Sequence, residues 1–444
     1  MTDAVTEEEL AAFHRVVGKL RALPVDDPVR LRTEQVAASY ARDGRLRRRK
    51  ARDAEASAAD ASVMAATATG ALDRREDAPL AARDAPGSGG VLARPRGCYV
   101  CKAPYREVGS FYHRLCPRCA ADNTARRALA TDLRGRRALL TGGRVKIGFQ
   151  LALMMLRDGA EVLVTSRFPH DVRRFRAAPG SGRWLDRLTV LAVDLRDPRQ
   201  VLGLCEELRQ EGRPLDILVN NAAQTVRRPP ESYALLAAGE RDALPEGARP
   251  APGFTPMRMI EGGAAALPVV LREADEAGLL PDPAPENSWS ARLGALDPAE
   301  VLEAQLVNAL APALLCDRLL PLLLASAHPR RYVVNVTAVE GRFAVRNKTA
   351  GHPHTNMAKA ALNMLTRTSA AELAGHGVHM CAVDTGWITD ENPAPKKARM
   401  AGAGFRTPLD VVDGAARVYD PIVRGEAGDP VSGVFLKDYR EAAW

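Results

Sequence analysis

Four cysteines in the first third of the chain have a spacing that suits a metal ion. They form two CxxC pairs with fourteen residues between the pairs: Cys98, Cys101, Cys116 and Cys119. Two thiolates on each tight turn can approach one ion at about 2.3 Å, in the tetrahedral arrangement of structural Zn²⁺ sites. His113 lies nearby and could replace one thiolate, but four thiolates already complete the tetrahedron. The spacing therefore predicts a closed, structural zinc site. The alternative is that the cysteines are redox-active or that their spacing is coincidental. The aromatic residues around them are expected to form the small core of this module: Tyr99, Tyr105, Phe111 and Tyr112.

A glycine-rich turn follows a short apolar run further along the chain. The run at Ala138–Thr141 leads into Gly142-Gly143-Arg144-Val145-Lys146-Ile147-Gly148, and a helical pattern begins there. At the start of a helix, small residues let a phosphate approach unpaired backbone N–H groups and the positive end of the helix dipole. Such a turn alone is weak evidence for a phosphate-binding site, so the interpretation depends on the strands and helices around it.

The elements that would position this turn alternate regularly from Arg136 onward. Strands rich in Val and Leu are expected at Ala138–Thr141, Glu161–Thr165, Leu188–Val193, Leu215–Val219, Tyr332–Val336, Val378–Val383 and, more weakly, Gly433–Lys437. Helices are expected at Phe149–Arg157, Val201–Gln210, Val301–Leu324 and Asn356–Ala374. Short apolar strands of this kind are buried on both faces. The alternation predicts an α/β fold with a doubly wound parallel sheet.

Further residues follow the turn in a fixed order, each near the end of an expected strand. They are Val164-Thr165-Ser166-Arg167, Asp194-Leu195 and Asn220-Asn221-Ala222-Ala223. Together with the TGxxxGxG-like turn, this succession resembles the short-chain dehydrogenase/reductase superfamily. The resemblance implies a Rossmann-type domain from about residue 133 to the C-terminus that binds NADP(H) and transfers a hydride.

The resemblance also implies which residues contact the cofactor. They are Thr141, Gly142, Gly143, Arg144, Lys146, Ile147 and Gly148 in the turn, Asp194 at the adenine, and Asn221, Lys359 and Thr389 further along. Arg167 stands where the family reads the adenosine ribose. A carboxylate there would accept the 2′-OH, whereas an arginine suits a 2′-phosphate, and Arg144 could reinforce it. NADP is therefore expected over NAD.

The catalytic set of the family is only partly present. Lys359 matches the lysine that lowers the pKa of a catalytic tyrosine, and Asn308 matches the asparagine of the proton relay. Thr355 stands in place of the tyrosine and Ala338 in place of the serine. A threonine hydroxyl is far too weak an acid to replace a phenol. His354 is a candidate for proton transfer, because an imidazole titrates near neutral pH.

Two further departures concern the cofactor. Lys146 replaces the second glycine of the turn, where its Cβ would crowd the pyrophosphate although its ammonium could pair with it. Asp384-Thr385-Gly386-Trp387-Ile388-Thr389 resembles the PG…T segment of the family with its proline lost. Thr389 could still reach the nicotinamide carboxamide.

An insertion separates Asn221 from Asn308 by 86 residues, where the family has about two dozen. It spans roughly 224–297 and leaves the carboxyl edge of the sheet, where open α/β folds bind ligands. We expect a substrate lid or a docking surface, with a surface excursion as the alternative. Because the catalytic set is only partly present, two functions are open: an oxidoreductase with an altered active site, or a catalytically silent nucleotide-binding scaffold that recognises a partner through the zinc module and the insertion.

The chain before the sheet is predicted in two parts, a helical and partly disordered basic region at 1–93 and the zinc module at 94–132. Thr6 and Glu9 predict a capping box for a helix over 6–22. The polybasic run at 45–52 is expected to be exposed and partly helical, with nucleic-acid binding as the alternative. Pro, Gly and Ser at 85–90 predict a flexible connector.

The net charge of +8 is concentrated in one stretch. Arg94–Arg137 holds 11 basic and 3 acidic residues. Such a surface attracts an acidic protein or a nucleic acid, with a solvated face as the alternative. The acidic N-terminus does not resemble a secretory signal, and no run approaches the ~18 apolar residues of a membrane helix. We expect a cytoplasmic protein that does not enter a membrane, acts on an unidentified small molecule and forms a homo-oligomer.

Overall fold

The computed structural model describes residues 4–81, 89–240, 242–256, 274–282, 284–345 and 348–444. The chain divides into two compact units. One holds residues up to Ser62 together with Leu92–Arg94, and the other holds Val63–Val91 and Pro95–Trp444. Part of the insertion expected at 224–297 lies outside the described residues.

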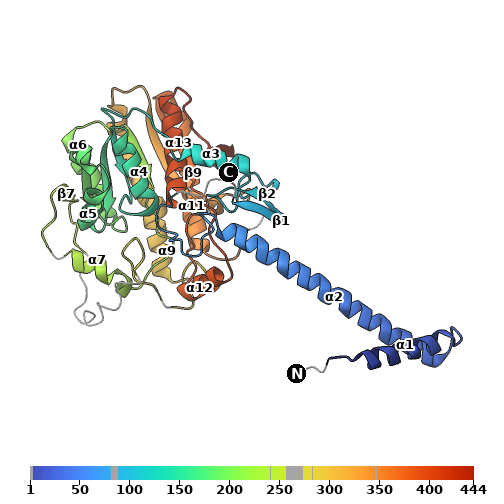
Figure 1. Ribbon diagram of the computed structural model, residues 1–444. Coiled ribbons are helices and arrows are strands. Elements are labelled where there is room, and N and C mark those ends of the chain that lie inside the picture. Colours follow the sequence, from blue (N-terminus) through green and yellow to red (C-terminus); the bar gives the residue numbers. More distant parts are fainter. Residues whose placement is uncertain (1–3, 82–88, 241, 257–273, 283, 346–347) are drawn as a thin grey trace. The chain divides into compact units, whose positions relative to one another are not determined.

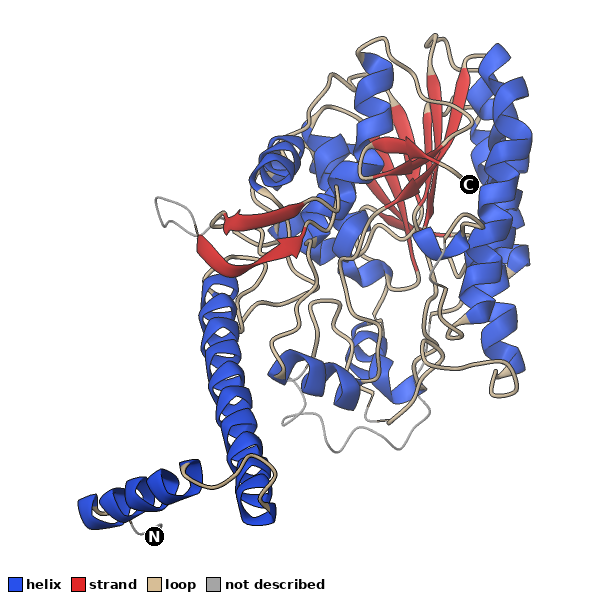
Figure 2. Cartoon of the chain, turned by 90° about the vertical axis from the view of Figure 1, so that its right-hand side faces the viewer, coloured by secondary structure: helices blue, strands red, loops and turns tan. Residues whose placement is uncertain are grey.

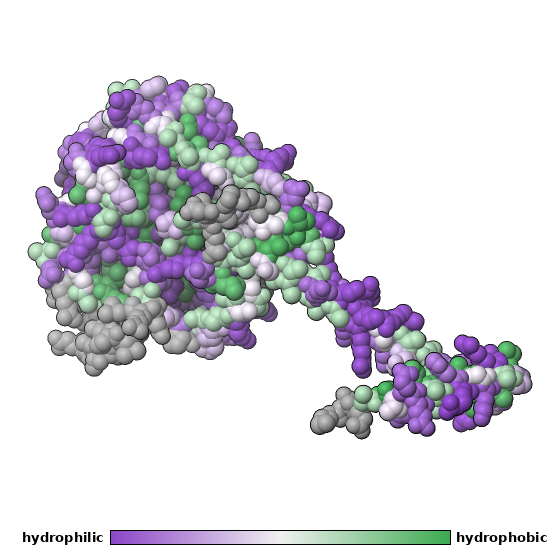
Figure 3. Space-filling view, viewed as in Figure 1, coloured by the Kyte–Doolittle hydropathy of each residue, from purple (hydrophilic) through white to green (hydrophobic). Residues whose placement is uncertain are grey.

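The first unit consists of helix α1 (Glu7–Arg21) and most of α2 (Pro28–Ala65) (Figure 1). The capping box of α1 is confirmed, because Thr6 Oγ1 accepts from the Glu9 N–H at 3.2 Å and the Glu9 carboxylate accepts from the Thr6 N–H at 2.8 Å. The polybasic run belongs to the uninterrupted helix α2, and so it is wholly rather than partly helical. Hydrophilic side chains cover most of the middle of α2 (Figure 3).

A nine-stranded sheet forms the centre of the second unit (Figure 2), in the order β11-β10-β9-β8-β6-β3-β4-β5-β7. The strands are β3 (Arg137–Leu140), β4 (Glu161–Ser166), β5 (Leu188–Ala192), β6 (Ile217–Asn220), β7 (Ala248–Pro250), β8 (Arg331–Thr337), β9 (Val378–Asp384), β10 (Phe435–Lys437) and β11 (Arg440–Ala442). All neighbours pair in parallel except β10 and β11. The seven expected strands are confirmed, while β7 and β11 were not expected, because three residues carry too short a pattern.

Helices cover both faces of this sheet. The helices packed against it are α4 (Lys146–Arg157), α6 (Pro198–Glu211), α10 (Ala311–Leu324), α11 (Pro353–Gly375) and α13 (Val411–Glu426). The same unit also contains α5 (Val172–Ala177), α7 (Ala234–Gly239), α9 (Pro298–Gln305) and α12 (Ala394–Gly402). Short 3₁₀ turns lie at Pro169–Asp171, Ser181–Arg183, Leu185–Arg187, Pro230–Tyr233 and Val339–Gly341, and a π-helical turn at Leu306–Leu310. One apolar core lies between the sheet and α4 and α13, and a second lies under α6, α10 and α11. The doubly wound α/β fold is thus confirmed.

One expectation about apolar runs is wrong. The helical stretch Pro298–Leu324 is long and apolar enough to cross a membrane by length and composition. Its residues Leu315, Leu319 and Leu323 are fully buried in the second core, against the sheet. The expectation failed because a core helix that faces a sheet can be as apolar as a membrane span.

The cysteine module precedes the sheet in the chain. Strands β1 (Gly90–Gly97) and β2 (Pro104–Val108) pair antiparallel, and helix α3 (Pro117–Arg126) follows. Residues from Pro95 onward lie in the same compact unit as the sheet.

Candidate functional site

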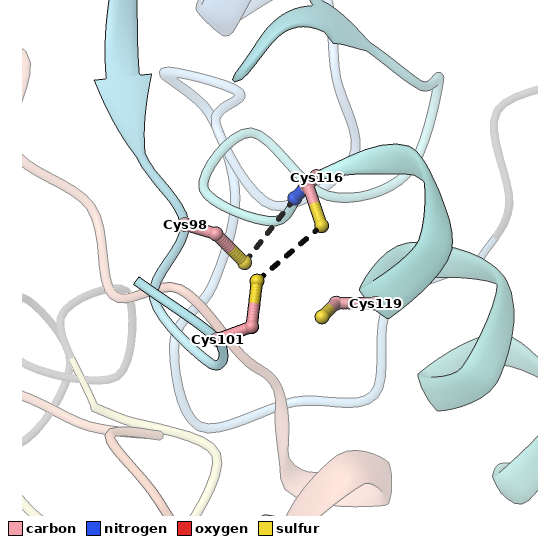
Figure 4. Close-up of side chains that lie close together, drawn as sticks. All are labelled: Cys98, Cys101, Cys116 and Cys119. Atoms are coloured by element: carbon pink, nitrogen blue, oxygen red, sulfur yellow. Dashed lines mark hydrogen bonds between the residues drawn. The ribbon is translucent and has the colours of Figure 1, made fainter. Parts of the chain in front are cut away.

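The four cysteines form one cluster, in which the sulfurs all lie within 4.8 Å of one another (Figure 4). Cys98 follows β1, Cys101 closes the next turn, and Cys116 and Cys119 stand at the start of α3. The Sγ atoms of Cys101 and Cys116 are 3.7 Å apart. A tetrahedron with metal–sulfur bonds of about 2.3 Å has edges of roughly 3.8 Å, so this donor set fits Zn²⁺.

His113 does not belong to this cluster. Its Nδ1 lies 2.7 Å from Thr69 Oγ1, and burial lowers its pKa to about 3. The histidine therefore joins the segment before the module to the module itself, and the four-cysteine set is the one that the structure brings together.

The glycine-rich turn has the form expected of a phosphate site. Gly142 has a φ of +69°, and Lys146 also has a positive φ, +52°, at the position where the family has a glycine. A Cβ at Gly148 would lie 2.1 Å from the Gly142 carbonyl oxygen, which excludes any larger residue. Helix α4 begins at Lys146, and its N-cap residue Val145 makes no side-chain cap. The first backbone N–H groups of α4 are thus left for a ligand.

Two expected cofactor residues meet at a carboxylate that the sequence did not point to. Lys146 Nζ lies 3.8 Å from Glu391 Oε1, and the Thr389 hydroxyl donates to the same oxygen at 2.9 Å. Burial alone would raise the pKa of Glu391, but Lys146 and Thr389 lower it, so the carboxylate is ionised. Glu391 links the glycine-rich turn to the segment after β9. No motif marks it, because the contact joins residues far apart in the chain.

The residue that follows β6, Asn221, is hydrogen-bonded to the start of the glycine-rich turn. Asn221 Nδ2 donates to the carbonyl oxygens of Thr141 and Gly142 at 3.0 and 3.1 Å. The Thr141 hydroxyl accepts from the Asn221 backbone N–H at 3.0 Å. Three residues predicted to contact the cofactor are therefore adjacent in space.

At the end of β4, Arg167 lies against an aromatic pair. Its guanidinium carbon is 5.4 Å from the centre of the Tyr233 ring and 5.7 Å from that of Phe168. Arg144 instead donates to the Asp171 carboxylate and, at 2.7 Å, to the Ala277 carbonyl oxygen. These internal partners compete with the role expected of Arg144 at a 2′-phosphate, whereas for Arg167 no ion pair is found among the described residues.

The adenine-side aspartate is also paired. Asp194 Oδ2 lies 2.6 Å from Arg196 Nη2. Burial would raise the pKa of Asp194, but its hydrogen bonds and ion pair with Arg196 lower it. The carboxylate is ionised and fixed at the end of β5.

Lys359 and Thr355 lie one turn apart on α11 and are both buried. Lys359 Nζ donates to the Val336 carbonyl oxygen at 2.8 Å, and burial lowers its pKa to about 8. Asn308 lies in the π-helical turn and exchanges two hydrogen bonds with the Gln224 backbone, at 2.7 and 2.9 Å. Single π-helical turns are frequent at functional sites.

Unsatisfied polar atoms gather at the start of α11. Thr355 Oγ1 and His354 Nδ1 are buried, and neither has a hydrogen-bond partner among the described residues. Buried polar groups nearly always have partners in native proteins, so such atoms are candidates for ligand contact. Burial, and then His352, lower the pKa of His354, so its imidazole is neutral near pH 7.

The end of the insertion packs against this region. The Trp289 and His352 rings stack with centroids 3.9 Å apart and planes 6° apart. His352 Nδ1 lies 3.0 Å from the Trp289 carbonyl oxygen, and the His352 N–H donates to the Ala291 carbonyl oxygen at 2.9 Å. Neither contact could be found from the sequence, since nothing in it places Trp289 against α11.

A mostly parallel sheet with a glycine-rich turn at the carboxyl end of β3 is the arrangement of a Rossmann-type α/β fold. The family model of short chain dehydrogenases matches residues 136–236, and that of the enoyl-(acyl carrier protein) reductases matches 283–404. The chain belongs to the short-chain dehydrogenase/reductase superfamily.

Two relatives are similar in sequence to this chain over different lengths. An uncharacterized protein of Acanthamoeba polyphaga mimivirus is 31% identical over 347 residues, which are 74% of this chain and 71% of that protein. A peroxisomal 2,4-dienoyl-CoA reductase of Danio rerio is 30% identical over 102 residues, 22% of this chain and 33% of the reductase.

Two solved structures are each similar in fold to about 70% of the chain. The Pseudomonas aeruginosa RhlG/NADP complex has a TM-score of 0.45 and 22% identity, and the match covers 69% of this chain and 95% of that one. The carbonyl reductase Sniffer of D. melanogaster has a TM-score of 0.46 and 17% identity, with 70% and 100% covered.

Proposed function

We propose that this chain binds NADP(H) and is an oxidoreductase with an altered active site. The observation that carries the proposal is the turn between β3 and α4. Lys146 adopts the left-handed backbone of the missing glycine, and the N-terminus of α4 has no side-chain cap. The turn thus keeps the backbone shape of a phosphate site despite the substitution. The Lys146 ammonium beside it is shared with the Glu391 carboxylate, which competes with a pyrophosphate for this cation.

The preference for NADP over NAD rests on Arg167. It follows β4 directly, where a carboxylate would favour a free 2′-OH. Its guanidinium contacts two aromatic rings and makes no ion pair among the described residues, although its charge helps to lower the pKa of Asp194. We expect it to bind a 2′-phosphate.

When bound, the cofactor supplies or accepts a hydride at nicotinamide C4. Lys359 and Asn308 would orient the ribose and relay a proton, and the neutral imidazole of His354 is a poor proton donor near pH 7. Water is then the proton source in a reduction. Because hydride addition to an activated alkene gives an enolate, which is a weaker base than an alkoxide, this site suits such an alkene better than a ketone or an imine.

The alternative is a catalytically silent scaffold that binds a nucleotide and recognises a partner through the zinc module and the insertion. The replacement of both the serine and the tyrosine, by Ala338 and Thr355, favours it. A partner at Arg94–Arg137, a homo-oligomer and a cytoplasmic location stay predictions. We further propose one structural zinc ion per chain at the four cysteines.

Calorimetric titration with NADPH and NADH tests the proposal. We expect NADPH to bind at least about tenfold more tightly, and Arg167→Asp to remove that preference. Arg173→Asp makes the same charge change on the exposed surface of α5 and should leave the ratio unchanged. An unchanged ratio in Arg167→Asp would contradict the assignment of Arg167, and binding of neither cofactor would contradict the proposed function as a whole.

A further inference from the structure

The turn between Cys98 and Cys101 is hydrogen-bonded to the segment that follows β9. Tyr99 lies between the ligand pair Cys98 and Cys101, and its Oη accepts from the Trp387 backbone N–H at 2.9 Å. Gly386, with a φ of +81°, approaches the same phenol, since a Cβ there would lie 3.5 Å from the oxygen. The contact is between a metal-binding turn and the residues that resemble the nicotinamide segment of the family.

The rest of the module holds the other end of this segment. Residues 385–410 connect β9 to α13, and Asp410 and Asp413 form the capping box of α13. Arg127 Nη1 lies 2.6 Å from Asp410 Oδ1, and Tyr112 Oη donates to Asp413 Oδ1 at 2.5 Å. The sequence predicted that Tyr99 and Tyr112 belong to a core within the module. Instead, their phenol groups form hydrogen bonds that link the module to the sheet domain.

We infer that Tyr99 is a positioning residue for the nicotinamide half of the cofactor site, through which the metal site sets cofactor affinity. This rests on the proposed function, since Thr389 is assigned to the nicotinamide by resemblance. The ligands on either side of Tyr99 fix its backbone, so the phenol presents a fixed acceptor to Trp387, two residues before Thr389. The Thr389 hydroxyl is bonded in turn to Glu391, the partner of Lys146.

The test is Tyr99→Phe in the full chain, purified with its metal. The substitution keeps the ring and all four cysteines and removes only the acceptor. We expect one zinc ion per chain as in wild type, an NADPH Kd about 3- to 10-fold higher, as for the loss of one hydrogen bond, and an unchanged Kd for 2′,5′-ADP, which lacks a nicotinamide. The matched control is Tyr105→Phe, whose phenol donates to the His113 carbonyl oxygen at 2.9 Å inside the module. It should change neither Kd.

Equal weakening of NADPH and 2′,5′-ADP would overturn the inference, because it would mean general loosening of the site. So would an NADPH Kd within twofold of wild type. Hydrogen exchange at the Trp387 amide separates this result from failure of the proposed function, since it needs no cofactor. We expect protection in wild type and in Tyr105→Phe, and loss of it in Tyr99→Phe and after zinc chelation; equal protection in all four would refute the role of Tyr99 even if NADPH did not bind.

Discussion

At the scale of single residues, Lys146 has a positive φ of +52°, and its ammonium lies 3.8 Å from Glu391 Oε1. The sequence shows a lysine where the family has a glycine at 146. That this lysine takes a left-handed backbone and pairs with Glu391 follows only from the folded chain. A non-glycine residue with such a φ costs about 1–2 kcal/mol. Contacts of the surrounding structure must offset this cost, and the ion pair with the partly buried Glu391 is one of them.

Lys359 predicts a pH dependence of stability. Burial lowers its pKa to about 8 from the ordinary 10.5. Between these values the unfolded chain holds a proton that the folded protein does not, so raising the pH through this window stabilises the fold. In Lys359→Met this contribution is absent. The free energy of unfolding in urea, wild type minus variant, should therefore rise from pH 8 to 10.5, and parallel curves would contradict the shift.

The replaced catalytic residues predict slow reduction of ordinary ketones. We expect Thr355→Tyr combined with Ala338→Ser to accelerate NADPH oxidation by ketones about 10²-fold or more, since general acid catalysis contributes ~10²–10⁴-fold. The assay is the loss of NADPH absorbance with a panel of ketones and conjugated enones. If the parent protein is already fast and His354→Ala abolishes its activity, a histidine relay operates and the scaffold alternative fails. If neither protein oxidises NADPH with any acceptor although both bind it, the scaffold alternative is favoured.

At the scale of elements, periodicity sufficed for those that are long and buried. Strands β3 to β6, β8 and β9 and helices α4, α6 and α11 appear within a few residues of their expected bounds. The helix expected at Val301–Leu324 is formed by α9, a π-helical turn and α10, while the short helices α5 and α7 were not expected. Helix α13 was not predicted, although Asp410-Val-Val-Asp413 is a capping signal that could have revealed its start. The contacts of Tyr233 with Arg167 and of Trp289 with His352 could not be predicted, because they depend on where the insertion returns to the sheet.

The start of α13 carries a prediction about stability. Arg127 is mostly buried and pairs with Asp410 and Asp413, both fully buried. Arg127→Leu leaves two buried carboxylates without their cation, which costs about 3–5 kcal/mol. Arg134→Leu is the control, since Arg134 is 83% exposed in its pair with Asp132 and should cost within about 1 kcal/mol. The two free energies of unfolding are measured in urea, and similar losses would show that the buried pair contributes little.

At the scale of the whole molecule, the composition shows where the net positive charge lies along the chain, but not which of these cations are already in ion pairs. Four of the eleven basic residues in Arg94–Arg137 lie in ion pairs with other parts of the second unit: Arg126, Arg127, Arg136 and Arg137. The pairs of Arg126 and Arg127 join the module to the sheet domain, and those of Arg136 and Arg137 lie within the sheet domain. Part of the charge that suggested a partner therefore contributes to folding instead. The polybasic run at 45–52 differs, because its six cations are exposed on α2 and no ion pair is found for any of them within the described chain.

This difference predicts where a polyanion would bind. At 100° per residue, the six cations at 45–52 point to all sides of α2, leaving no apolar face for a membrane. A duplex groove encloses a helix, so it could meet them on several sides. If the protein binds a labelled 20-base-pair duplex, R47Q/R48Q/R49Q should weaken binding and reduce the slope of log K against log salt by about 3. The matched control is K102Q/R106Q/R118Q, three exposed cations of the zinc module, which should change little. Binding is measured by fluorescence anisotropy. If the control variant loses more affinity for the duplex than R47Q/R48Q/R49Q does, the interface lies in Arg94–Arg137 instead. If the wild-type protein does not bind the duplex, the nucleic-acid partner is ruled out.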